Sequence, residues 1–272
     1  MFAPGARPGP AWLFCPADRP DRFAKAASLA DIVIIDLEDG VGPADKATAR
    51  TALMDNRLDP GRTVVRVNSF GSAEHALDLT ALGQSHYRTV MLAKTESAHQ
   101  VTSLAPLTVV ALIETPRGVV HASEIAGAAN TVAMMWGAED LIAGLGGMSS
   151  RDTSGGYRDV ARHARSTVLL AAVSCGRYAI DAVHLEIADL AGLAIEASDA
   201  AASGFSATAC IHPTQIAVVR QAFRPSPADI LWATELLKAA QSAAGVFVFQ
   251  GRMVDAPLLR HATTIVARAQ LG

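Results

Sequence analysis

The segment IVIIDLEDGV, residues 32–41, determines the fold prediction, because an uncharged β-branched run passes directly into a group of acids. Its first four residues are all apolar and lack the alternation of a strand that has one face in water. Continuous apolar runs of this length are typical of parallel strands that are covered on both faces. The segment therefore predicts a buried parallel strand over residues 32–36, with Asp36, Glu38 and Asp39 at its carboxyl end.

The same pattern recurs along the chain. Further short apolar runs lie at residues 11–15, 63–68, 89–94, 108–114, 131–137, 180–185 and 207–213. The segments between them have the apolar spacing of helices, and Asp18, with Pro20 two residues later, is expected to begin the first helix. Eight strands, each followed by a helix, predict an α/β protein with a (β/α)8 TIM barrel rather than an open doubly wound sheet.

One of the predicted helices covers residues 157–175. Its spacing puts five residues on one buried face, and Gly176 follows as a helix-ending residue. The residues on that face are Val160, Ala164, Val168, Ala171 and Cys175.

The end of the chain exceeds what eight strand–helix repeats need. Ser226 and Pro227 form a good N-cap and first-turn pair for a helix through Ala244, with Gly245 after it. We therefore expect a TIM-barrel catalytic domain over residues 1–225 and a largely helical C-terminal extension over residues 226–272.

Composition excludes several classes of protein. The 272 residues are 50% hydrophobic and 18% charged, with 23 Lys and Arg against 26 Asp and Glu. This balance does not suit a disordered chain or a basic protein that binds nucleic acid. No apolar run approaches the ~18 residues of a membrane span. The N-terminal stretch MFAPGARPGPAW has Pro and Gly where a secretory signal would be apolar, so we expect a cytoplasmic protein.

Charged and polar side chains gather where the predicted strands end. In a barrel these carboxyl ends converge on one face, which is where active sites lie. Besides the acids after residue 35, the residues at these ends are Arg66, Asn68, Lys94, Glu114, Glu139, Asp140 and His212.

Glu114 and Asp140 are candidate metal ligands, because they follow adjacent predicted strands. Mg2+ typically takes one or two carboxylates and completes its octahedron with water and substrate oxygens. Zinc would prefer clustered His or Cys, which this sequence does not offer. The alternative is that both acids are solvated residues at the rim of the barrel.

Two bases at the strand ends each have two interpretations. Arg66 lies in an apolar strand and could clamp a carboxylate or a developing oxyanion, or it could form a structural ion pair with Asp36 or Glu38. Lys94 could form a Schiff base, although the metal-type carboxylates favour a different electrophile.

Seven segments carry a family resemblance that spans nearly the whole chain. They are LFCPADRPDRFAKA (13–26), DLEDGV (36–41), VVRVN (64–68), IETPRGV (113–119), WGAEDL (136–141), CIHPTQI (210–216) and GRMVDAP (251–257). With these segments the chain resembles the citrate lyase β-subunit-like proteins of the HpcH/HpaI aldolase and malyl-CoA lyase superfamily, and within it the stand-alone actinobacterial branch.

This resemblance implies a Mg2+-dependent lyase, usually a homotrimer. Such an enzyme cleaves or forms the C–C bond of a 3-hydroxyacyl-CoA, such as malyl-, citramalyl- or hydroxymethylglutaryl-CoA, to give acetyl-CoA and a keto acid. Glu114 and Asp140 match the metal ligands, and Glu114 also lies against the substrate. Arg66 matches a catalytic arginine that holds substrate oxygens. Glu38 and Asp39 match acids that order metal-bound water.

The resemblance also assigns the remaining contacts. The main chain of Gly137, Ala138 and Glu139 matches a loop that cradles a keto-acid carboxylate. Asp255 matches a catalytic aspartate on a C-terminal segment that, in relatives, covers a neighbouring subunit's site. The CoA-contacting positions are Phe14, Arg19, Arg22, Lys25, Ile211, His212 and Pro213.

Two other functions stay open at this stage. One is a metal-dependent aldolase that acts on free keto acids, against which Arg19, Arg22, Lys25 and Asp255 argue. The other is a non-catalytic subunit that binds acyl-CoA or supports a complex, which the complete set of candidate catalytic residues disfavours.

Overall fold

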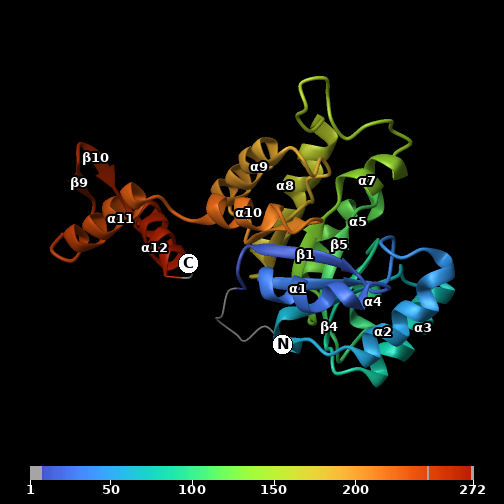
Figure 1. Cartoon of the computed structure of the whole chain (residues 1–272). Coiled ribbons are helices and arrows are strands. Elements are labelled where there is room, and N and C mark those ends of the chain that lie inside the picture. Colours follow the sequence, from blue (N-terminus) through green and yellow to red (C-terminus); the bar gives the residue numbers. More distant parts are fainter. Residues whose placement is uncertain (1–7, 244, 271–272) are drawn as a thin grey trace. The chain divides into compact units, whose positions relative to one another are not determined.

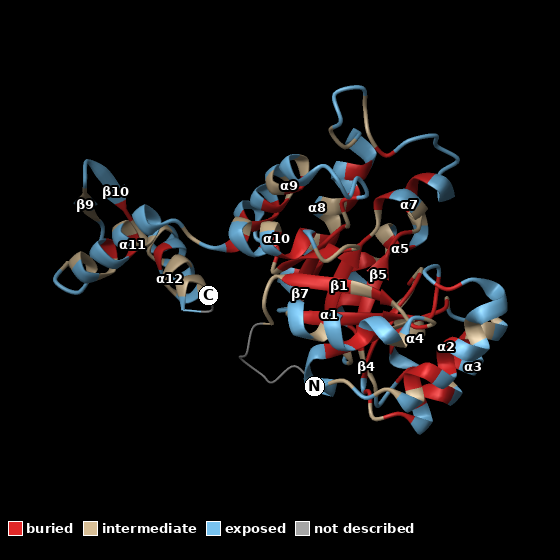
Figure 2. Cartoon of the chain, viewed as in Figure 1, coloured by how far each residue is buried: buried red, intermediate tan, exposed pale blue. Residues whose placement is uncertain are grey.

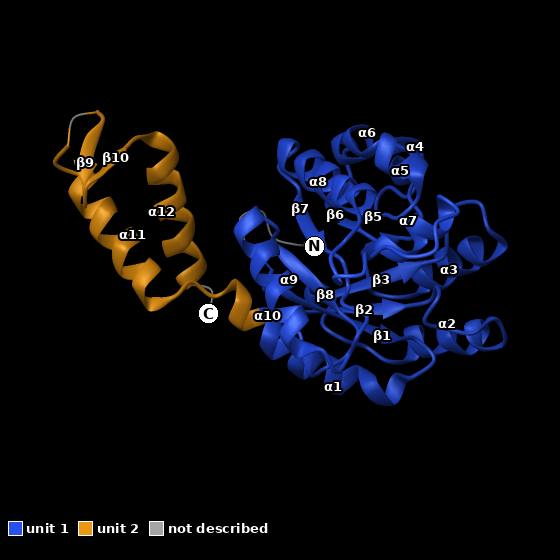
Figure 3. Cartoon of the chain, turned by 90° about the horizontal axis from the view of Figure 1, so that it is seen from above, with its two compact units in different colours: residues 1–219 blue, residues 220–272 orange. Residues whose placement is uncertain are grey.

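The computed structural model describes residues 8–243 and 245–270, which form two compact units (Figures 1 and 3). The first unit is residues 1–219 and the second is residues 220–272. The boundary expected between residues 225 and 226 falls inside the second unit. Residues 1–7 of the N-terminal stretch and Ala244, the expected end of a helix, lie outside the described residues.

Strands of the first unit form a closed parallel barrel, as the sequence predicts. Each strand pairs with the next along the chain, and β1 pairs with β8 to close the ring. The strands are β1 (Ala11–Pro16), β2 (Ile32–Asp36), β3 (Thr63–Val67), β4 (Thr89–Leu92), β5 (Thr108–Ile113), β6 (Thr131–Trp136), β7 (Tyr178–Asp181) and β8 (Ala207–Cys210).

Helices connect the strands and surround the barrel, which confirms the (β/α)8 prediction (Figure 1). They are α1 (Phe23–Leu29), α2 (Lys46–Asp55), α3 (Ala73–Gln84), α4 (Ala98–Thr102), α5 (Pro116–Val120), α6 (Ala122–Gly127), α7 (Ala138–Gly144), α8 (Asp159–Ser174), α9 (Leu190–Ser203) and α10 (Gln215–Phe223). Short 3-10 turns precede α1, α2 and β3, at Pro20–Arg22, Pro43–Asp45 and Pro60–Arg62.

The core explains why the strands are apolar throughout. Side chains such as Trp12, Ile34, Met91 and Leu112 fill the interior of the barrel, while the other strand face packs under the helices. Figure 2 shows the strands as a buried centre and the helices exposed on their outer sides. Every residue of β2 is buried, as its unbroken apolar pattern predicts.

Three local predictions are wrong in detail. The strand expected at residues 180–185 is β7, Tyr178–Asp181, because its pairing with β8 ends at Asp181 and Thr208. Asp18 does not cap the first helix: the turn begins at Pro20, and Arg19 stands at its N-cap without a side-chain bond. Val160 is 44% exposed, because the buried stripe of α8 begins at Ala161.

The second unit is a helical hairpin joined by a two-stranded sheet. It comprises α11 (Pro227–Ala240), β9 (Phe247–Phe249), β10 (Arg252–Val254) and α12 (Ala256–Ala269). Ser226 and Asp229 form a capping box at the start of α11, as Ser226 predicts, but the helix ends at Ala240 rather than at residue 244. Its own small core includes Leu236, Val254 and Ala262. None of the described helices combines the length and apolar character needed to cross a membrane.

Candidate active site

A cavity of about 340 Å³ lies at the carboxyl ends of the barrel strands. Its lining combines acidic and basic side chains with apolar residues such as Leu112, Met135 and Val183. The structure brings nine of the sequence-predicted site residues to its wall: Phe14, Asp39, Arg66, Glu114, Gly137, Ala138, Glu139, Asp140 and Ile211.

Strand register places Arg66 beside Asp36. The two residues are direct partners in the β2–β3 pair, and the Arg66 Nε and Nη2 atoms donate to Asp36 at 2.7 and 2.6 Å. Arg66 Nη1 also lies 3.1 Å from Glu38, and its guanidinium packs over the Phe14 ring. Burial alone would lower the pKa of Arg66, but the Asp36 and Glu38 carboxylates outweigh burial and raise it. Arg66 therefore carries a fixed positive charge at the cavity wall while it forms the structural ion pair.

The loop after β2 is fixed through its main chain. Asp36 accepts hydrogen bonds from the N–H groups of Glu38 and Gly40, both at 2.9 Å. A Cβ at Gly40 would lie 2.2 Å from Asp36 Oδ2, so this turn requires glycine. The Lys46 ammonium donates to the carbonyl oxygens of Leu37 and Glu38, at 2.8 and 3.0 Å.

Asn68 links this loop to the next helix. Its side chain donates to the Leu37 carbonyl at 2.9 Å and to the buried carboxylate of Asp78 at 2.7 Å, and it accepts from Lys46 at 3.0 Å. The sequence indicates Asn68, because that residue is polar and stands at a strand end. The sequence does not indicate Lys46, because that residue begins the next helix, α2, rather than ending a strand. Both residues therefore hold the main chain of the loop that carries Glu38 and Asp39.

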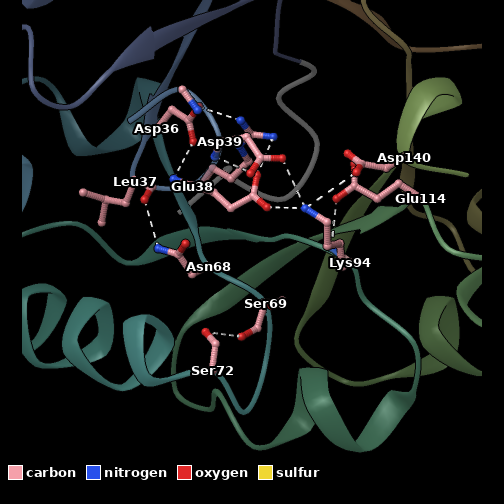
Figure 4. A network of polar contacts seen from close by, with 12 residues as sticks. Asp36, Leu37, Glu38, Asp39, Asn68, Ser69, Ser72, Lys94, Glu114 and Asp140 are labelled. Atoms are coloured by element: carbon pink, nitrogen blue, oxygen red, sulfur yellow. Dashed lines mark hydrogen bonds and ion pairs between the residues drawn. The ribbon is translucent and has the colours of Figure 1, made fainter. Parts of the chain in front are cut away.

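Lys94 lies among four acids, which we call the acid cluster: Glu38, Asp39, Glu114 and Asp140 (Figure 4). Its ammonium contacts Glu38, lies 3.2 Å from Asp39 Oδ2 and lies 3.8 Å from Asp140 Oδ1. Burial alone would lower the pKa of Lys94, but the hydrogen bond to Glu38 and the surrounding acids raise it. A lysine that holds its proton this firmly does not suit the Schiff-base interpretation.

Glu114 is the most enclosed acid of the cluster, with only 3% of its surface exposed. Its Oε1 atom accepts from the Lys94 main-chain N–H at 3.0 Å. Burial raises the pKa of Glu114 to about 8, and the nearby Asp140 and Glu38 carboxylates add to this shift. Gly137 allows this placement, because a Cβ there would lie 2.8 Å from Glu114 Oε2. When Glu114 is ionised, the cluster holds an excess of negative charge that a bound cation would neutralise.

The donor set fits Mg2+. Glu114 and Asp140 both line the cavity, and the side chain of Asp140 is 40% exposed. The described residues contain no group of three or more His, Cys, Asp and Glu side chains arranged to hold a metal ion. Two carboxylates with access to water and substrate are the ligand set that Mg2+ commonly takes.

The Glu139 side chain is held by a hydrogen bond and does not join the candidate metal ligands. Its Oε1 atom accepts from the hydroxyl of Ser150, which is buried in the loop after α7, at 2.7 Å. Glu139, Gly137 and Ala138 all line the cavity. Ser150 thus ties the loop after α7 to the rim, and no sequence pattern indicated this role.

The other sequence-predicted residues lie outside the cavity lining. Glu38 is buried beside it and contacts Arg66 and Lys94. The basic residues at the start of α1 are exposed, and Arg19 pairs with Asp21 at 3.0 Å. Asp255 belongs to the second unit, where it accepts from the Leu258 N–H at the start of α12. The remaining residues of the set are Arg22, Lys25, His212 and Pro213, the last two half-buried.

Comparison with known proteins connects this geometry to a family. The model of the HpcH/HpaI aldolase/citrate lyase family matches residues 11–213. A citrate lyase subunit beta-like protein of Mycobacterium tuberculosis is 62% identical over 96% of both chains. The human mitochondrial citramalyl-CoA lyase is 33% identical over 96% of this chain and 86% of its own.

A solved structure matches the fold closely. The CitE protein of Mycobacterium tuberculosis, in complex with magnesium, acetoacetate and coenzyme A, superposes with a TM-score of 0.94 at 62% identity. The match covers 96% of this chain and 98% of that one. With the family model spanning the barrel and its strand-end residues, the chain belongs to the HpcH/HpaI aldolase/citrate lyase family of carbon–carbon lyases.

Proposed function

We propose that the protein is a Mg2+-dependent lyase that cleaves or forms the C–C bond of a 3-hydroxyacyl-CoA, such as malyl-, citramalyl- or hydroxymethylglutaryl-CoA. The products of cleavage are acetyl-CoA and a keto acid. The observation that carries this proposal is the meeting of Glu114 and Asp140 with the Arg66 guanidinium in one cavity. Relatives named as CoA-thioester lyases, and a solved relative that holds magnesium and coenzyme A, support it.

Each charged group then has a task in cleavage. Glu114 and Asp140 would hold the cation, which supplies Lewis-acid stabilisation of charge on the substrate hydroxyl oxygen. Arg66 offsets charge that develops on oxygen as the C–C bond breaks. The main chain of residues 137–139 would orient the carboxylate of the keto-acid part.

The substrate hydroxyl gives up its proton to solvent as the keto acid forms, and the second carbon fragment leaves as the enolate of acetyl-CoA, which takes up one proton. We assign this step to Asp255, which would protonate the enolate carbon, or remove that proton in the condensation direction. We propose a cytoplasmic homotrimer in which Asp255 serves a neighbouring subunit. The segment GRMVDAP, residues 251–257, supports this assignment, because it resembles the C-terminal segment that covers a neighbouring subunit's site in relatives.

The CoA part of the substrate would bind along the start of α1 and the end of β8. Phe14 and Ile211 line the cavity, so they would contact the end of CoA nearest the thioester. Arg19, Arg22 and Lys25 are exposed bases and would meet its phosphates. The half-buried His212 and Pro213 continue this surface beyond Ile211.

A substrate panel tests the lyase proposal. Purified protein is incubated with Mg2+ and each of the three acyl-CoA candidates, and acetyl-CoA release is followed. We expect release from at least one, loss in chelator, and loss in Glu114→Gln. Glu124→Gln makes the same change on the exposed side of α6 and serves as the control. Absence of turnover with every substrate, with or without metal, would refute the proposal.

Subunit mixing tests the role of Asp255. Asp255→Ala and Arg66→Ala proteins, each inactive alone, should regain part of the activity after mixing and reassembly. If verified subunit exchange restores none, Asp255 acts within its own chain. Turnover of free keto acids without acyl-CoA binding would favour the aldolase alternative. Acyl-CoA binding without turnover, together with fixed partner subunits, would favour the non-catalytic one.

A further inference from the structure

Lys94 is placed in the acid cluster by its backbone as well as by its side chain. Its φ angle is 51°, in the left-handed region that residues other than glycine disfavour. In this conformation its main-chain N–H points at Glu114 Oε1, while its ammonium reaches the three other acids (Figure 4). One residue therefore contacts all four carboxylates of the cluster.

The charges around the cavity are unbalanced. With every acid ionised, five carboxylates, the acid cluster and Asp36, face two positive side chains, Arg66 and Lys94. Arg66 forms a two-point ion pair with Asp36 and so neutralises that carboxylate. Arg66 also reaches Glu38, but among the described residues Lys94 is the cation that contacts Asp39 and Asp140 as well, and like charges left unneutralised there would repel one another.

The three ammonium contacts differ in strength. Glu38 is buried and in direct contact, whereas Asp140 Oδ1 lies 3.8 Å away on a side chain that is 40% exposed. Asp140 can therefore exchange partners most easily. Glu38 is also held by Arg66, at 3.1 Å, and keeps its place independently of Asp140.

We propose that the Lys94 ammonium acts as an internal cation: it holds the acid cluster together before a divalent cation binds, releases Asp140 when that cation arrives, and weakens cation binding by charge repulsion. This inference rests on the metal site of the proposed function. It makes Lys94 a positioning residue that sets the affinity for Mg2+, through the acids it contacts, rather than a group that reacts with substrate.

The loss of Lys94 is expected to tighten Mg2+ binding rather than to weaken it. Removing a residue that merely supports the ligands would weaken Mg2+ binding, whereas removing an internal cation tightens it. Lys94→Met should lower the Kd for Mg2+ by about tenfold or more, and should also lower the metal-free melting temperature. Lys94→Arg keeps the charge and should stay within about threefold of the wild-type Kd.

The measurement is calorimetric titration of the full chain with Mg2+ alone, with every variant in the same buffer at the same pH. Thermal melts with and without Mg2+ accompany it. Lys46→Met is the matched control, because among the described residues that ammonium donates hydrogen bonds to carbonyl and amide oxygens rather than to a carboxylate. We expect no tightening in this control.

An unchanged or higher Kd in Lys94→Met would overturn the proposal. If that variant fails to fold without metal, Lys94→Met/Glu38→Gln is compared with Glu38→Gln alone, and the double variant should bind Mg2+ more tightly. A wild-type protein that binds no Mg2+ would refute the metal site, independently of any lyase assay. If the wild-type enzyme is active but Lys94→Met does not bind Mg2+ more tightly, only the proposed role of Lys94 is refuted, and the lyase function stands.

Discussion

Gly137→Ala tests whether the placement of Glu114 determines activity. Gly137 has φ −124° and ψ 126°, a conformation that alanine adopts without strain. The only obstacle is steric, because the new Cβ would lie 2.8 Å from Glu114 Oε2 and 2.9 Å from Glu114 Cβ. The substitution therefore acts on the buried Glu114 carboxylate, which accepts from the Lys94 main-chain N–H.

The size of the effect follows from these contacts. The Cβ is about 0.6 Å short of ordinary van der Waals contact, and Glu114 has little free space because it is 3% exposed. Overpacking of this kind costs about 1–3 kcal/mol of stability. A metal ligand displaced by up to about 1 Å should lower kcat/KM by about 100-fold.

Steady-state kinetics, Mg2+ titration and urea unfolding of the variant give the three readouts. Gly83→Ala is the matched control, since its Cβ in α3 would meet nothing within 4 Å. Alanine in a helix should leave activity unchanged and raise stability by up to about 1 kcal/mol. Wild-type activity and Mg2+ affinity in Gly137→Ala would show that Glu114 is not confined as described, and the reasoning would fail.

Three further predictions concern pH, the buried ion pair and the second unit. Because the pKa of Glu114 rises from 4.5 to about 8, the folded chain keeps a proton that the unfolded chain releases, so metal-free stability should fall as pH rises between these values. Melts in chelator should show a flatter slope for Glu114→Gln, and equal slopes would contradict the assignment. Arg66→Met strands the buried Asp36 and should cost about 3–5 kcal/mol in urea unfolding, with part recovered in Arg66→Met/Asp36→Asn; a single variant close to wild type would contradict a structural ion pair. Ser226→Ala removes the capping box of α11 and should cost about 1 kcal/mol, seen as faster hydrogen exchange in that helix; unchanged exchange would show that the cap contributes little.

The barrel was predictable because its strands are buried on both faces. The unbroken run at residues 32–36 gave β2 with its observed bounds. At β7 the same reasoning failed, because the apolar residues after Asp181 continue in the sequence but not in the sheet. There the Asp181 carboxylate instead accepts from the Trp136 indole at 2.5 Å and binds Arg165, partners that local pattern cannot reveal.

The sequence predicts which residues stand at the strand ends of the candidate site, but it does not predict the ion pairs and hydrogen bonds between them. Strand order alone brings Glu114 and Asp140 to one rim. The pairing of Arg66 with Asp36 needs the register between β2 and β3, and the position of Lys94 needs its left-handed backbone. Lys46 stands ten positions after Asp36, on a helix, so only the fold relates it to the acids.

The way in which the loop after β2 is tied has a practical consequence for redesign. Lys46 and Asn68 donate hydrogen bonds to the main-chain carbonyl oxygens of residues 37 and 38. Every amino acid has such a carbonyl group. These ties do not depend on which side chains the loop carries. The Glu38 carboxylate also accepts from the Asp39 N–H at 3.0 Å, so it is part of the loop's support. The exposed Asp39 can be exchanged to retune the charge of the site while the loop keeps its path, which makes this position a place where new selectivity could be engineered or could evolve.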